Sequence, residues 1–133
     1  YLKEASRHIS DLDGDLIELI KGNAEDLPFE DNSLQAVSCV YLFHELPRTV
    51  REIVLKEFFR VLEPGGILVL ADSIQIVDSP NFISIMEGFY KNFHEPFYCD
   101  YIKDNIDSKM EEIGFNNIGT KSFFMTKVWS AIK

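Results

Sequence analysis

The stretch RVLEPGGILVLAD, residues 60–72, constrains the fold of this chain more than any other. Proline cannot continue a helix, and glycine readily adopts the left-handed conformation that closes one. Pro64 and the pair Gly65-Gly66 therefore predict a helix end followed by a turn. The apolar run 67–71 is too short for a buried helix and contains branched side chains. We expect a central strand here, buried on both faces of its sheet.

Helical and strand-like patterns alternate through the rest of the chain. Apolar residues at helical spacing, with Ser79-Pro80 as a start signal and Gly114 as a stop signal, predict helices at 1–9, 48–62, 79–93 and 101–113. Short apolar runs predict strands at 16–21, 34–41, 115–124 and 126–132. Strands that alternate with helices indicate an α/β fold. Its sheet should be mostly parallel, covered on both faces, with an antiparallel hairpin at the carboxyl end.

Composition narrows the classes of function. The 133 residues suffice for one domain or part of one, and 46% of them are hydrophobic. A net charge of −9 argues against a nucleic-acid partner, because phosphate binding needs a basic face. No apolar run approaches the length of a membrane span, so no membrane partner is expected. Cys39 and Cys99 lack metal-ligand spacing, so we expect no metal and interpret both as buried free thiols in a reducing, cytoplasmic compartment.

Three stretches, taken in their order and spacing, resemble class I S-adenosylmethionine-dependent methyltransferases, most closely the small-molecule "type 11" group. GNAEDLPF at 22–29 looks like the loop after the third strand of that family, and CVYLFHEL at 39–46 looks like its fourth strand and the following loop. Residues 60–72 look like its fifth strand. The resemblance covers essentially the whole chain. It implies a Rossmann-like sheet with strand order 3-2-1-4-5-7-6 and methyl transfer from S-adenosylmethionine to an unidentified small molecule.

The resemblance also implies a set of cofactor contacts. Ligands of an open α/β sheet sit beyond the carboxyl ends of its strands, where the loops 23–29 and 41–45 are expected. Carried over, Asn23 and Ala24 face the adenine edge, and Tyr41 and Leu42 pass the methionine and ribose parts. Most family members have Asp where this chain has Asn23. Asn keeps a hydrogen-bond acceptor but lacks the charge. Glu25 is a further candidate contact, and the alternative is a solvated loop charge.

The substrate side is expected around His44 and Asp72. His44 is a candidate general base, and the alternative is a loop histidine that packs or caps locally. Asp72, at the end of the fifth strand, either touches substrate or caps the next turn. The aromatic side chains between Phe82 and Tyr98 either line an apolar substrate pocket or belong to the core.

The family's glycine-rich loop and the acidic residue that binds ribose have no counterpart in these 133 residues. We therefore expect a truncated, single partial domain holding strands three to seven, with cofactor binding only in the complete domain. An open edge on the fourth strand predicts one of two pairings. The third strand pairs with it directly, or two copies pair as a homodimer. The alternatives are a catalytically inactive, self-associating α/β fragment, or another Rossmann-like nucleotide binder.

Overall fold

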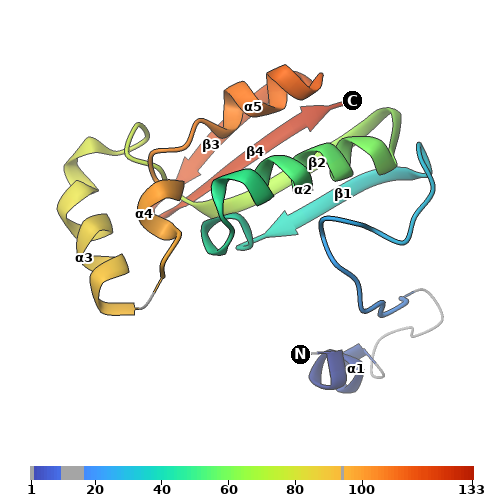
Figure 1. The fold of residues 1–133 in the computed structure, drawn as a ribbon, viewed down its shortest axis with the longest axis horizontal. Helices are drawn as coiled ribbons and strands as arrows, with labels where there is room; N and C mark the ends of the chain where they lie inside the picture. The colour runs from blue at the N-terminus through green and yellow to red at the C-terminus, as the bar shows by residue number, and fades with distance from the viewer. Residues whose placement is uncertain (1, 10–16, 94) are drawn as a thin grey trace.

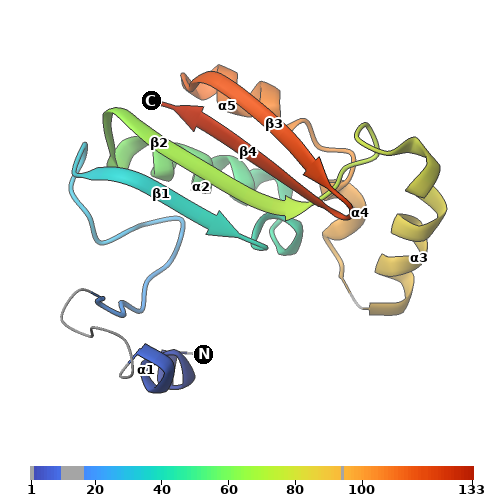
Figure 2. The same cartoon turned by 180° about the vertical axis from the view of Figure 1, so that it is seen from behind.

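The computed structural model describes residues 2–9, 17–93 and 95–133. Its centre is a four-stranded sheet with the order β1-β2-β4-β3 (Figures 1 and 2). β1 (Leu34–Val40) and β2 (Leu62–Ser73) are parallel, whereas β4 (Thr126–Ile132) is antiparallel to both β2 and β3 (Asn116–Phe123). This order equals strands 4-5-7-6 of the expected plan, and it confirms an α/β sheet that ends in an antiparallel hairpin.

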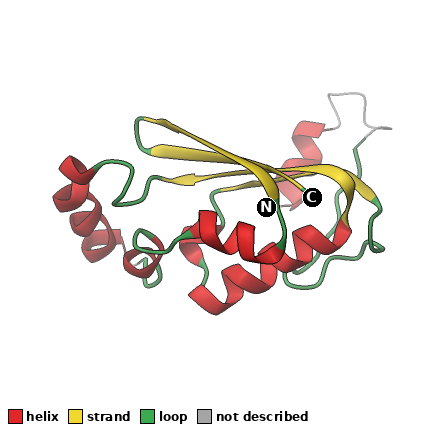
Figure 3. Ribbon diagram, turned by 90° about the horizontal axis from the view of Figure 1, so that it is seen from above, coloured by secondary structure: helices red, strands yellow, loops and turns green. Residues whose placement is uncertain are grey.

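The helices lie mainly on one side of this sheet. α2 (Arg48–Val61) and α5 (Ile106–Ile113) cover one face (Figure 3). Two short elements, the 3-10 helix η2 (Phe43–Glu45) and α4 (Tyr98–Tyr101), lie near the carboxyl end of β1, whereas α1 lies beyond the β1 edge (Figure 1). The remaining elements are α1 (Leu2–Ile9), the 3-10 helix η3 (Pro80–Phe82) and α3 (Ile83–Phe93).

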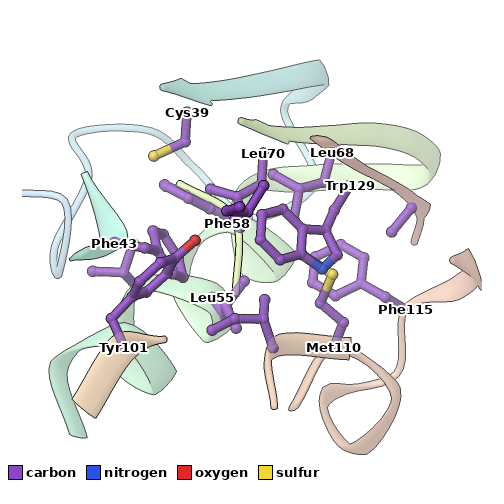
Figure 4. Close-up of a cluster of buried hydrophobic side chains, with 14 of the residues drawn as sticks. Cys39, Phe43, Leu55, Phe58, Leu68, Leu70, Tyr101, Met110, Phe115 and Trp129 are labelled. Atoms are coloured by element: carbon purple, nitrogen blue, oxygen red, sulfur yellow. The ribbon is translucent and has the colours of Figure 1, made fainter. Parts of the chain in front are cut away.

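The hydrophobic core fills the space between the sheet and the helices on its covered face. Leu68 and Leu70 of β2 point into it together with Trp129 of β4 and Leu55 and Phe58 of α2 (Figure 4). Side chains alternate along a strand, so Ile67, Val69 and Ala71 point to the other face, where Ile67 is exposed and the other two are only partly buried. The expectation that β2 is buried on both faces is therefore wrong.

The turn at Gly65-Gly66 is built as the sequence predicts, but it does not interrupt the strand. α2 ends at Val61, and Gly65 has a left-handed φ of 86°. The Gly65 N–H donates to the Lys133 carbonyl (3.0 Å) and the Lys133 N–H donates to the Gly66 carbonyl (3.0 Å), so β4 pairs across the turn. β2 therefore begins at Leu62, and its register with β1 shifts at this point.

Three further expectations need correction. Of the strand expected at 16–21, the described residues 17–21 form no regular secondary structure, and position 16 lies outside the described residues. Direct pairing of this segment with β1 is therefore wrong. The helix expected at 79–93 divides into η3 and α3, and the Ser79 side chain makes no capping hydrogen bond. The helix expected at 101–113 divides into α4 and α5, because Asn105 starts a new helix by accepting from the Ser108 N–H (3.0 Å).

Candidate active site at the carboxyl ends of β1 and β2

His44 and Asp72, which are 28 residues apart in the sequence, form a pair at the carboxyl ends of two adjacent parallel strands. The His44 Nδ1 lies 2.7 Å from Asp72 Oδ1. A carboxylate accepts, so the proton of this hydrogen bond belongs to Nδ1, and Nε2 is left as the basic nitrogen of the neutral ring. The pair thus has the arrangement in which a carboxylate orients a histidine.

Asp72 is fully buried, because it continues the inward-facing alternation of Leu68 and Leu70. Burial of a carboxylate is costly unless donors surround it. Here the Phe43 N–H donates to Oδ2 (2.8 Å), and the Ser73 N–H donates to Oδ1 (2.7 Å) beside the His44 ring. These two backbone donors fix the carboxylate, so it can hold the imidazole in one orientation.

The surroundings of His44 favour its protonated form. The hydrogen bond that His44 donates to Asp72 raises the pKa of His44 above the usual 6.5; partial burial works in the opposite direction, and the charges of Asp72, Glu95 and Glu45 add to the rise. His44 is therefore a stronger base than a free histidine, and it is neutral only at a pH above its raised pKa.

A cavity of about 380 Å³ adjoins this pair and is lined by Tyr41, His44, Ser73, Tyr98 and Met125. The Tyr98 hydroxyl is hydrogen-bonded to Ser73 Oγ (2.7 Å), and burial raises the pKa of Tyr98, so its hydroxyl stays protonated near neutral pH. The ring of His44 is met edge-on by Tyr41 and Tyr98, with ring centres 6.2 and 6.1 Å away. The cavity therefore joins a basic nitrogen to mainly aromatic and apolar walls.

The expected cofactor residues divide between this site and a separate segment. Tyr41, with a left-handed φ of 52°, and Leu42 lie in the loop that leads to His44. The Asn23 side chain instead accepts from the Glu25 N–H (3.2 Å) within its own turn, and Ala24 packs against the core.

The segment after that turn is fixed to the far half of α2. The Leu27 N–H donates to Glu57 Oε1 (2.7 Å), and Arg60 donates to the Leu27 carbonyl (3.2 Å). Glu57 is nine residues beyond Arg48, where α2 begins next to the His44 loop. At 1.5 Å per helical residue, this places the anchor roughly 14 Å along the helix from that loop. Among the described residues, no hydrogen bond or ion pair joins Asn23, Ala24 or Glu25 to His44, and their cofactor role stays a prediction.

The partnership of His44 with Asp72 was not foreseen from the sequence, although both residues were singled out. A signal was present, because parallel strands 34–41 and 67–71 must place their carboxyl ends together. Cys39 and Cys99 are both free thiols, as the sequence predicts. Cys39 is buried, and burial raises the pKa of its thiol to about 12, whereas Cys99 is only half-buried, so the expectation of burial is wrong for Cys99.

Comparisons with known proteins identify the family to which the chain belongs. A family model described as "Methyltransferase domain" matches residues 1–70, just over half of the 133-residue chain. The chain is 39% identical over 77 residues to a demethylmenaquinone methyltransferase of Bacillus pumilus, covering 58% of this chain and 30% of the relative. It is 29% identical over 140 aligned residues to the demethylmenaquinone methyltransferase of Staphylococcus haemolyticus, covering 91% of this chain and 55% of the relative.

A solved structure of similar fold is described as an S-adenosylmethionine-dependent methyltransferase, possibly a histamine N-methyltransferase, from Thermotoga maritima. It has a TM-score of 0.60 and 20% identity, over 96% of this chain and 69% of that one. The fold is thus that of class I S-adenosylmethionine-dependent methyltransferases. The chain belongs to the methyltransferase domain family. It spans 30% and 55% of the length of the two curated relatives.

Proposed function

We propose that this chain is part of an S-adenosylmethionine-dependent methyltransferase that methylates a small molecule held in the cavity beside His44. The observation that carries the proposal is the His44–Asp72 pair at the carboxyl ends of β1 and β2, joined by a 2.7 Å hydrogen bond, with His44 in the lining of a cavity. This is the edge of the sheet where α/β enzymes bind their ligands.

The proposed role of His44 is that of a general base. S-adenosylmethionine supplies an electrophilic methyl group when it is bound. An oxygen, nitrogen or sulfur acceptor that carries a proton attacks better once this proton is removed, and His44 Nε2 is the basic atom of the cavity. Asp72 keeps the Nδ1 proton in place, so that Nε2 is the nitrogen that accepts. General base catalysis contributes about 10²–10⁴-fold to a rate.

The described residues fit the acceptor better than they fit a whole cofactor. In the described part of the chain, the cavity lining contains no carboxylate for the hydroxyl groups of a ribose. Tyr41 and Leu42 remain the residues proposed to pass the methionine end, and Asn23, Ala24 and Glu25 remain the proposed adenine-side residues. We therefore assign complete cofactor binding to a longer domain, of which this chain contributes strands four to seven.

The acceptor proposed here is small and partly apolar. Tyr41, Tyr98 and Met125 give the cavity aromatic and thioether walls, while His44 and Ser73 provide its polar side. The curated relatives are named demethylmenaquinone methyltransferases. The proposal for this chain extends only to a small molecule with a ring, which suits the aromatic walls, and a transferable proton.

The test is methyl transfer from labelled S-adenosylmethionine to a panel of small hydroxylated aromatic compounds. Protein containing this chain should show turnover, and His44→Gln should lower it by about 10²–10⁴-fold. Glu52→Gln is the matched control, because among the described residues Glu52 forms an ion pair only with Lys56 (2.6 Å), on the exposed side of α2. Full activity in His44→Gln would exclude the general-base role. Titration calorimetry with S-adenosylhomocysteine tests cofactor binding separately: micromolar binding by these 133 residues alone would exclude the need for a longer domain.

A second candidate is a non-enzymatic, self-associating fragment, and the exposed side of the sheet favours it. β1 is one of the two edge strands, no described strand pairs with its outer edge, and the Val40 side chain is 61% exposed. Unpaired edges next to apolar side chains promote association. We propose a homodimer through this edge. Light scattering that reports a monomer at tens of micromolar would overturn it.

A further inference from the structure

Arg51 is fully buried in the second turn of α2, although it carries a permanent charge. Its Nε donates to the carbonyl oxygens of Phe43 (3.1 Å) and Leu46 (3.0 Å). These two carbonyls flank His44, so one nitrogen of Arg51 closes the loop in which His44 lies. A buried arginine is rare unless it is paired, and its position calls for an explanation beyond packing.

The other nitrogens of the same guanidinium bind the segment 98–104, which is distant in the sequence. Its Nη1 donates to Asp104 Oδ2 (2.5 Å), and its Nη2 pairs with Asp100 Oδ2 (3.0 Å). The guanidinium also lies over the Tyr101 ring, 5.5 Å from the centre. This segment contains α4, and so it contributes Tyr98 to the wall of the cavity.

The two segments meet again at the end of β2. The Tyr101 hydroxyl donates to the Ser73 carbonyl (2.6 Å), and the Tyr98 hydroxyl is hydrogen-bonded to Ser73 Oγ (2.7 Å). Ser73 directly follows Asp72. The loop with His44, the strand end with Asp72 and the wall with Tyr98 are therefore held together by contacts that converge on Arg51.

We propose that Arg51 is a positioning residue, which holds the His44 loop and α4 together so that His44 stays in hydrogen-bond contact with Asp72. The inference rests on the proposed function of the site. Only arginine serves here, because its planar fork presents five donors in fixed directions, whereas lysine offers one compact charge. Arg51→Lys keeps the charge beside Asp104 but cannot reach both loop carbonyls as well.

Arg48 provides a matched control in the same helix. It also pairs with Asp104 (3.0 Å), but its side chain is 55% exposed, and its described hydrogen bonds and ion pairs reach only Asp100 and Asp104. Replacement of Arg48 therefore removes a similar ion pair without releasing the His44 loop.

The readout is the titration of the His44 ring, followed by NMR in the 133-residue chain. His44→Gln assigns the signal among the three histidines. The groups around the His44 ring are Asp72, Glu95, Glu45, Tyr41, Tyr98 and Tyr101. Of these, Asp72 provides the hydrogen bond that the proposal concerns.

In Arg51→Met and Arg51→Lys we expect the midpoint to move to lower pH, toward the ordinary 6.5 of histidine, because the hydrogen bond to Asp72 weakens. The sign separates positioning from simple electrostatics. Loss of a positive charge in Arg51→Met would by itself move the midpoint to higher pH. Arg48→Met should leave it where it is.

An unchanged or raised midpoint in folded Arg51→Lys overturns the proposal. An equal shift in Arg48→Met overturns it as well, because the effect would then come from Asp104. Where Arg51→Met fails to fold, Arg51→Lys decides, since it keeps the buried charge pair. The titration needs no methyl transfer, so failure of the proposed activity and failure of this inference are distinguishable. If His44→Gln retains activity while the His44 midpoint in Arg51→Lys moves as expected, Arg51 still positions His44, but His44 is not a general base.

Discussion

The two faces of the central sheet differ more than any other two regions of the molecule. On one face, Leu68, Leu70 and Trp129 are fully buried under α2 and α5 (Figures 3 and 4). On the other face, Ile67 is 47% exposed and Val40 is 61% exposed. Neighbouring positions of one strand therefore have opposite environments.

The difference shows where stability and chemistry reside. The covered face holds the apolar core and, in the same alternation, the carboxylate of Asp72, so the site shares the stability of the core. The other face is apolar without being packed, which is a property of surfaces that bind a partner. Substitutions on the two faces should accordingly act on different observables.

The largest effect is expected at Trp129. Trp129→Ala removes a fully buried ring and the hydrogen bond from its Nε1 to Asp107, and it should lower the free energy of unfolding by about 3–5 kcal/mol. Ile67→Ala, on the other face of the sheet, should cost about 1 kcal/mol or less. Urea denaturation measures both. Equal losses would show that the two faces are equally packed in solution.

The start of β2 allows the same comparison between adjacent glycines. A methyl group at Gly66 would lie 2.8 Å from the Glu63 carbonyl oxygen and 3.2 Å from that of Gln35 in β1, so Gly66→Ala should cost about 2–3 kcal/mol. At Gly65 the space is open, and only the left-handed φ opposes a side chain, at about 1 kcal/mol. In thermal denaturation, Gly66→Ala should melt at a lower temperature than Gly65→Ala. The reverse order would contradict the close approach of β1.

Asp72→Asn should change how stability depends on pH. Because the folded-state pKa of His44 is raised above 6.5, the His44–Asp72 contribution is fully present below pH 6.5 and is lost as pH rises through the folded pKa. The variant should lack this component, and the acid limb of any activity should move to lower pH. Asp78→Asn, which alters the ion pair with Lys127 (2.9 Å), is the control. It should keep the pH-dependent contribution of the His44–Asp72 pair. Unfolding curves between pH 5 and 8 that stay parallel for wild type and Asp72→Asn would argue against the pair.

The smallest effect on stability is expected at the open edge. Val40→Lys places a charge on an exposed position of β1 and should change the free energy of unfolding by less than about 0.5 kcal/mol. The same substitution should weaken self-association, because a lysine on an edge strand opposes strand pairing. Sedimentation velocity measures the change, with Ser130→Lys on the inner strand β4 as the comparison. An unaltered dimer in Val40→Lys would place the interface elsewhere.

Local pattern determined most of the fold. The apolar runs at 34–41 and 67–71, the left-handed Gly114 with its φ of 117°, and the hairpin at the carboxyl end all form as predicted. These signals depend on neighbours within a few residues, so the sequence contains them directly. The run at 16–21 has the same local character, yet its described residues form no strand, because a strand needs a partner that the local sequence does not reveal.

Tertiary structure decided the site. His44 and Asp72 were recognised separately, but their 2.7 Å contact depends on the parallel register of β1 and β2. Arg51 lies on the apolar stripe of α2 at helical spacing from Val54, Leu55 and Phe58, and this spacing indicates burial. Why a charge is buried there is explained only by its partners in the folded chain. Its pairing with Asp104, 53 residues away, depends on the break between α4 and α5. The sequence by itself determined most of the helices and strands, since backbone propensity and periodicity are local. Which charges meet in the interior was decided only by the packing of distant segments, because burial makes an unpaired charge too costly to keep.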